Sequence, residues 1–133
     1  MKITITLFMT ALLLMSCGNN SEEYAMQVGE YTTIEVEDVY DAGTVAKGTI
    51  IHVEFEIKNT GSYPLIIAEV KPSCSCTVPG YEENPIPPGE STILKAEVDT
   101  DRTGTGTINK PITVTANTKP STTTLMIKAT VNN

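Results

Sequence analysis

Residues 51–58 (IHVEFEIK) alternate apolar and polar side chains without interruption. Successive side chains of a β-strand point to opposite faces of its sheet, so this pattern predicts a strand with one buried face and one solvated face. A strand of this kind is stable only as part of a sheet that covers a core. This segment therefore constrains the fold more than any other part of the chain.

The same pattern recurs along the chain, with turn residues between the repeats. Apolar side chains alternate in 31–39, where Ile34 and Val36 share a face, and again in 92–98 and 125–131. Ile112 and Val114 mark a further strand. Residues 65–70 are almost continuously apolar, which predicts a strand covered on both faces.

The remaining segments are predicted connections. Residues 72–88 contain five prolines and are predicted to be a long irregular connection. Asp41 and Gly43 predict a bend between strands, residues 59–61 a hairpin-like connection, and residues 87–89 a tight turn that leads into a strand. Residues 101–106 predict a polar, glycine-rich loop.

About seven strands in about a hundred residues are typical of an immunoglobulin-like β-sandwich. The chain contains no Trp and only two Phe, so its core must be aliphatic. It also lacks a cysteine pair spaced to bridge two sheets. We therefore predict an all-β, immunoglobulin-like β-sandwich of about seven antiparallel strands, which forms a single domain over residues 31–133.

The N-terminus predicts export and a lipid anchor. Lys2 precedes a stretch, residues 3–15, that is apolar apart from three threonines, and this is the length of a signal-peptide core rather than of a membrane span. Residues 14–17 (LMSC) then resemble the lipobox that the lipoprotein signal peptidase reads. We predict a lipoprotein signal peptide at 1–16, cleavage before Cys17, and a lipidated cysteine with a flexible tether at 17–30. The alternative is an ordinary secretory signal followed by an incidental cysteine.

The expected location is the cell envelope, with the protein bound to the membrane through lipid on Cys17. Two or more acyl chains on one cysteine give stable anchoring. Gly18 stands where an inner-membrane retention signal would have Asp, so the outer membrane is the expected membrane. Glu22 and Glu23 loosely resemble the acidic surface-export signals of Bacteroidetes lipoproteins.

The charge of the chain argues against nucleic acid as a partner. The formal net charge is −7 at pH 7, and loss of Lys2 with the signal peptide would make it −8. An acidic surface repels phosphate groups and anionic lipid head groups. The expected partners are therefore the membrane, through the lipid, and an unidentified protein of the envelope.

A series of motifs in a fixed order resembles a known bacterial family. The motifs are residues 40–45 (YDAGTV), Gly48, 55–61 (FEIKNTG), 64–67 (PLII), 72–77 (PSCSCT) and 85–90 (PIPPGE). Together they are similar to domain-of-unknown-function family fifteen-seventy-three, over about residues 31–131. The resemblance implies an exported, often lipid-anchored protein with an immunoglobulin-like fold, and it implies no activity. One residue departs from the family pattern, because Ser75 replaces the usual Gly between the two cysteines.

Cys74 and Cys76 are the one candidate for chemistry, and three interpretations stay open. They form a structural element, as a local disulfide or as buried thiols; or a redox-active dithiol; or a ligand pair for a soft metal such as Cu(I). Residues two apart in a regular strand are about 6.6 Å apart, close to the upper limit for a disulfide, so a bridge would need a bend. Lys71 is the one cation near them in sequence.

No catalytic set is evident, and we predict that the protein is not an enzyme and needs no cofactor or metal. His52, the single histidine, lies on the predicted wet face beside Glu54 and Glu56, as expected for solvated side chains. A closed zinc site needs four ligands, more than two thiols and one histidine supply. The leading hypothesis is a non-enzymatic protein-interaction or assembly domain. The alternative is a thiol redox or copper-handling protein that uses Cys74 and Cys76.

Overall fold

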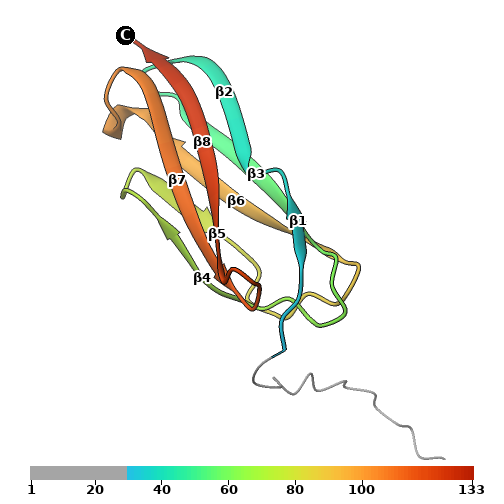
Figure 1. Cartoon of the computed structure of the whole chain (residues 1–133). Helices are drawn as coiled ribbons and strands as arrows, with labels where there is room; N and C mark the ends of the chain where they lie inside the picture. Colours follow the sequence, from blue (N-terminus) through green and yellow to red (C-terminus); the bar gives the residue numbers. More distant parts are fainter. Residues whose placement is uncertain (1–29) are drawn as a thin grey trace, which may run out of the picture.

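The structure, a computed structural model, describes residues 30–133. Cys17, the signal peptide predicted at 1–16 and the predicted tether up to residue 29 lie outside the described residues. Eight strands and one short 3₁₀ helix make up the described part (Figure 1). In chain order they are β1 (Ile34–Val36), β2 (Val39–Ala46), β3 (Ile50–Asn59), β4 (Ile67–Pro72), β5 (Thr77–Gly80), β6 (Ser91–Asp99), η1 (Thr100–Arg102), β7 (Gly106–Ala116) and β8 (Thr122–Asn132).

The strands form two four-stranded sheets that pack face to face, as Figure 1 shows. One sheet has the order β1-β3-β6-β5 and the other has the order β2-β8-β7-β4. Among these strands, β2 and β8 form the one parallel pair, and all other neighbours are antiparallel. The predicted immunoglobulin-like β-sandwich is thereby confirmed, with eight strands rather than about seven.

The additional strand arises because the chain changes sheets early. The segment 31–39 was predicted as one strand, but β1 ends at Val36. The chain then crosses to the second sheet and pairs with β8 as β2. Asp41 and Gly43 therefore lie within β2, where they form a bulge rather than the predicted bend between strands. Gly43 has φ +67° and donates its backbone N–H to Asp41 Oδ1 at 2.8 Å.

The core lies between the two sheets and is aliphatic, as predicted from the composition. The alternating residues of β3 face inward, and Phe55 is the one fully buried aromatic side chain within residues 30–133. Alternating residues of β6 and β8 complete the core from both sheets. Burial of each large apolar side chain contributes about 1.5–3 kcal/mol, so these three strands hold the two layers together.

Two predicted segments differ from the structure. Residues 65–70 are not covered on both faces, because β4 is an edge strand on which Ala68 and Glu69 are exposed. The connection predicted at 72–88 contains β5, which pairs with the edge of β6. Cys76 O accepts a hydrogen bond from Asp99 N, so the backbone groups of Cys76 point toward β6. Because this direction alternates from one residue to the next, the nitrogen of Pro79 points away from β6. An edge strand tolerates a proline in that position.

The predicted turn at residues 87–89 is confirmed. Glu90 N donates to Pro87 O at 3.1 Å, and Gly89 has φ +82° directly after Pro88. This is the arrangement of a type II turn, in which Pro precedes a residue with positive φ. β6 begins at the next residue after the turn.

A buried polar cluster closes the end of the sandwich where the described chain begins. The residues 59–61 were predicted as a hairpin-like connection, but Asn59 is the last residue of β3 and is fully buried. Its amide oxygen accepts from Thr32 Oγ1 at 2.6 Å and from Gly61 N at 3.2 Å. Its amide nitrogen donates to Tyr63 O at 2.8 Å and to Ile86 O at 2.9 Å. Asn59 thus joins the start of the domain to two loops.

Candidate functional site

β3 is paired along only part of one edge, because β1 is much shorter than β3. β1 pairs with three residues of β3, from Ile57 to Asn59. Beyond Val36 the chain leaves this sheet, and within the described residues no strand pairs with that edge over residues 50–56. We call residues 50–56, on the side away from β6, the free edge of β3.

The backbone groups at this edge have a defined direction. Asn59 N donates to Glu90 O next to β6, whereas Thr60 N donates to Thr33 O next to β1. Because the direction alternates along a strand, the N–H and C=O groups of His52, Glu54 and Glu56 point toward the free edge. These groups are available to hydrogen-bond another strand.

The free edge of β3 is also the most regular of the sheet edges in residues 30–133. β4 has six residues and ends in Pro72, and β5 has four residues that include Pro79 and Gly80. β2 is interrupted by its bulge. Short strands, prolines and bulges are features that prevent strand addition, and residues 50–56 have none of them.

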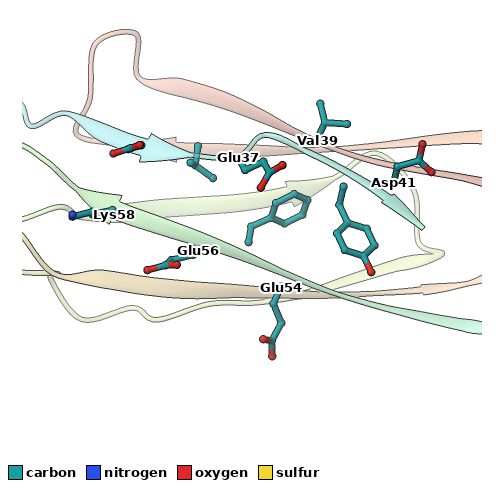
Figure 2. A pocket seen from close by; sticks show the side chains of 10 residues that line it. Glu37, Val39, Asp41, Glu54, Glu56 and Lys58 are labelled. Atoms are coloured by element: carbon teal, nitrogen blue, oxygen red, sulfur yellow. The ribbon is translucent and has the colours of Figure 1, made fainter. Parts of the chain in front are cut away.

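A groove of about 710 Å³ runs beside this edge, between β3 of one sheet and β2 of the other. Figure 2 shows Val39 and Asp41 on β2 and Glu54 on β3, the two strands that border the groove, with these side chains directed away from it. Phe55 and Tyr40 also line it, and Tyr40, which pairs with the buried Ile127, is 38% exposed. The groove therefore offers exposed apolar surface next to unpaired backbone groups.

The lining of this groove is predominantly acidic. It includes five carboxylates and a single basic side chain, Lys58. The carboxylates are Glu35, Glu37, Asp41, Glu54 and Glu56. Lys95 lies 3.7 Å from Glu54, but both side chains are well exposed, and such a surface pair is weak. The groove thus has a negative potential that favours a cationic occupant.

The polar side chains on the outer face of β3 have the exposure that the sequence predicts. His52, Glu54 and Glu56 are all exposed, and His52 Nδ1 lies 3.1 Å from Glu97 Oε1. The structure therefore agrees with their interpretation as solvated side chains. The sequence alone does not indicate that Glu54 and Glu56 border an unpaired edge, because that depends on where β1 ends.

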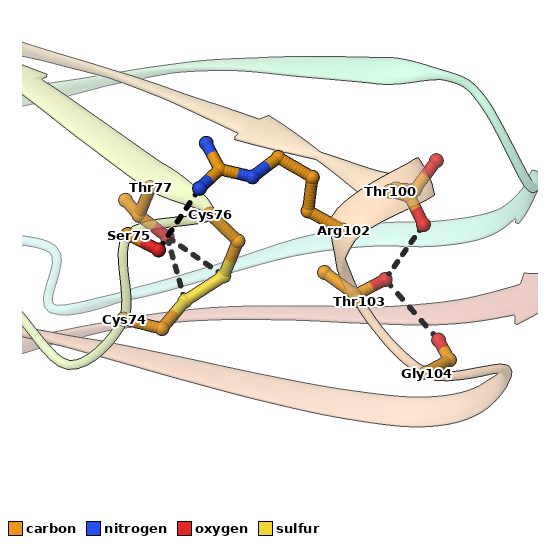
Figure 3. Close-up of a disulfide and its surroundings, with 8 residues drawn as sticks. All are labelled: Cys74, Ser75, Cys76, Thr77, Thr100, Arg102, Thr103 and Gly104. Atoms are coloured by element: carbon orange, nitrogen blue, oxygen red, sulfur yellow. Dashed lines mark hydrogen bonds between the residues drawn. A yellow bond between two sulfur atoms is a disulfide. The ribbon is translucent and has the colours of Figure 1, made fainter.

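Cys74 and Cys76 lie in the turn between β4 and β5, where their sulfur atoms form a disulfide (Figure 3). Thr77 N donates to Cys74 O, which bends the chain and brings the two Cα atoms to 5.3 Å. This is the bend that a bridge between residues two apart requires. Cys76 is buried and Cys74 is half-buried, and Thr77 Oγ1 lies 3.9 Å from each sulfur.

A distant cation lies beside this disulfide. Arg102, in η1, donates from Nη2 to Ser75 Oγ at 2.9 Å, as Figure 3 shows. The position of η1 is fixed by Thr100, which is buried and donates to Thr49 O at 2.7 Å. A guanidinium near a cysteine favours its thiolate form. The sequence gives no signal for this contact, because 27 residues separate Ser75 and Arg102.

Three further findings concern residues 30–133. No group of three or more His, Cys, Asp or Glu side chains in this part of the chain is placed to hold a metal ion. Nor does any helix in it have the length and apolar character needed to span a membrane. Glu82 is exposed, and hydrogen bonds from the backbone N–H and then the side chain of Asn84 lower the pKa of its carboxyl.

A family model described as "Protein of unknown function (DUF1573)" matches residues 26–131. The chain belongs to the DUF1573 family. The match covers both sheets, the free edge of β3 and the Cys74–Cys76 turn, and it confirms the resemblance that the order of the motifs indicates. No curated protein matches this DUF1573 chain.

Solved structures show how widely the fold of this DUF1573 domain is shared. A protein of unknown function from Porphyromonas gingivalis W83 superimposes with a TM-score of 0.69 and 24% identity, over 80% of this chain and 50% of that one. This chain thus spans half the length of that protein. The ASH/PapD-like domain 7 of human CEP192 matches with a TM-score of 0.58 and 11% identity, over 77% and 87% of the two chains.

Part of a protease also shares the fold. The VesB protease of Vibrio cholerae matches with a TM-score of 0.59 and 11% identity, over 75% of the DUF1573 chain and 32% of its own length. At this identity the likeness shows the fold alone. In residues 30–133, no serine hydroxyl bonds to His52, whose ring pairs with Glu97.

Proposed function

We propose that this protein is a membrane-anchored envelope lipoprotein whose domain is a non-enzymatic protein-interaction module. The observation that carries the proposal is the free edge of β3, which lies beside the groove between the two sheets. An extended segment of a partner would add to β3 as a further strand. In this mode main-chain hydrogen bonds supply affinity, and side-chain pockets supply specificity.

The immunoglobulin-like fold and the unpaired backbone of β3 support this proposal. The strand offers the alternating N–H and C=O groups of His52, Glu54 and Glu56, all directed away from β6. A partner strand would satisfy these groups and would cover the apolar surface of Tyr40. Burial of that surface adds to the stability of the complex.

The lipid on Cys17 would confine the domain to the membrane surface. Its partner is then another envelope protein, and the outer membrane is the proposed site of the encounter. The sequence of the lipobox supports this part of the proposal, and the acidic charge argues against nucleic acid as the partner.

Site-specific photo-crosslinking in intact cells tests this proposal. A photoreactive amino acid at position 54 of the full-length protein should trap a specific envelope protein. The same amino acid at position 69, exposed on β4, is the matched control. The proposal is wrong if position 54 traps no protein that position 69 does not also trap.

A second candidate is a thiol redox function of Cys74 and Cys76, which the contact between Arg102 and Ser75 favours. A dithiol reductant would convert the disulfide to two thiols, and the guanidinium would favour the thiolate form of the half-buried Cys74. The reduced pair would also suit Cu(I), whereas the disulfide leaves no thiolate to bind it.

Thiol titration before and after mild reduction, with metal analysis, tests this second candidate. A redox role predicts two thiols that appear after reduction and react faster in the wild type than in Arg102→Gln. Thiols that stay unreactive, or that react equally in both proteins, would contradict it.

A further inference from the structure

We infer that the segment accepted by the free edge of β3 is an extended strand in which basic side chains alternate with apolar ones. This inference rests on the proposed function and specifies the chemistry of the partner. It follows from the two faces that an added strand would present to the protein.

The outer face of the added strand would lie beside carboxylates. Residues directly opposite each other on paired strands place their side chains on the same face, about 5 Å apart. On the free edge, Glu54 and Glu56 hold two consecutive positions of that face, and Lys58 lies beyond them next to β1. Opposite charges across a strand pair stabilise it, so Lys or Arg is favoured opposite each Glu.

The inner face of the added strand would lie over the groove. Phe55 points inward from β3, and Tyr40 of β2, which pairs with the buried Ile127, faces inward from the other sheet. These side chains present apolar surface, and Tyr40 is 38% exposed. Apolar side chains at alternate positions of the partner would cover this surface. Because side chains of a strand alternate between faces, the two requirements together give a basic–apolar repeat.

The charges argue against two other occupants. The segment of this chain that precedes the domain, residues 18–29, contains Glu22 and Glu23 and no Lys or Arg. A second copy would place β3 against β3. An antiparallel pairing centred on Glu54 or on Glu56 then sets that glutamate opposite its own copy, and like charges in this position are destabilising.

A synthetic peptide with three Lys-Val repeats between terminal threonines tests the inference on the full-length protein, purified in detergent. Fluorescence anisotropy should show saturable binding, and the same peptide with Glu in place of Lys should not bind. Charge reversal in Glu54→Lys/Glu56→Lys should weaken binding by about tenfold or more. The control Glu69→Lys/Glu83→Lys changes the net charge equally at exposed positions away from the groove and should leave binding unchanged.

A second variant separates strand addition from charge attraction alone. His52→Pro removes an N–H that points to the free edge and leaves every carboxylate in place, whereas the hydrogen bonds to β6 come from Ile51 and Val53. Circular dichroism should confirm that this variant is folded, and its peptide binding should be lost.

Three results would overturn the inference: equal binding of the Lys and Glu peptides, equal loss in both double variants, or full binding by folded His52→Pro. If the peptide fails but crosslinking at position 54 traps a partner in cells, the inferred chemistry is wrong and the proposed function stands. If crosslinking also fails, both are wrong.

Discussion

Asn59 offers the most quantitative test of how the domain is held together. Its side chain is fully buried and makes four hydrogen bonds, to Thr32, Gly61, Tyr63 and Ile86. The substitution Asn59→Ala removes all four and adds no competing group. Its effect therefore measures the contribution of the cluster that joins the start of β1 to the end of β3.

The expected magnitude follows from the burial of the partners. A typical intramolecular hydrogen bond contributes about 1 kcal/mol net, and a buried group left without a partner costs more. Thr32 and Ile86 are almost fully buried, whereas water reaches the exposed Tyr63 and the half-buried Gly61. We expect a loss of about 3 kcal/mol in the free energy of unfolding. For a domain of this size, that loss lowers Tm by about 12–24 °C.

Urea and thermal unfolding followed by circular dichroism would measure this loss. Most domains are stable by about 5–15 kcal/mol, so Asn59→Ala should still fold. The control is Asn84→Ala, at an exposed position where the amide bonds only to Glu82, and it should change stability by less than about 0.5 kcal/mol. A loss below about 1 kcal/mol for Asn59→Ala would refute the assignment of Asn59 as the central residue of the cluster.

Three further outcomes are expected. Gly61→Ala should lower the free energy of unfolding by about 1–3 kcal/mol in urea, because its Cβ would collide with Thr32; unchanged stability would contradict this close approach. Cys74→Ser/Cys76→Ser should lower it by only about 1.5 kcal/mol, since the bridge closes a very short loop; a loss above about 4 kcal/mol would indicate a larger structural role. Cys17→Ser should move the protein from the membrane to the soluble fraction, and continued sedimentation with membranes would exclude the lipid anchor.

Much of the fold could be predicted because its central strands have strictly alternating sequences. β3 and β6 pair along nearly their whole length, and each buries every second residue. Burial of every second residue produces an alternating apolar–polar pattern in the sequence. The sequence of β5 has no such pattern, because an edge strand buries few side chains and accommodates Pro79 and Gly80.

The candidate site was only partly predictable, because it depends on tertiary placement. Cys74 and Cys76 are visible as a pair, whereas Arg102 reaches Ser75 only after β6 has returned the chain to the same end of the sandwich. The free edge of β3 exists because β1 ends at Val36 and the chain crosses to the other sheet. The local sequence at Glu54 and Glu56 does not indicate that β1 ends at Val36.

The positions of the two chain ends determine how the domain would respond to mechanical force. The described chain begins beside Asn117 and ends beside Lys47, at opposite ends of the long strands (Figure 1). A pull on the residues before Glu30 is directed along β1, roughly parallel to β3. Such a pull must shear the β1–β3 hydrogen bonds together with the contacts of Asn59. A partner held on the free edge would pull on the same strand, so tension between membrane and partner would pass through β3 from one end to the other.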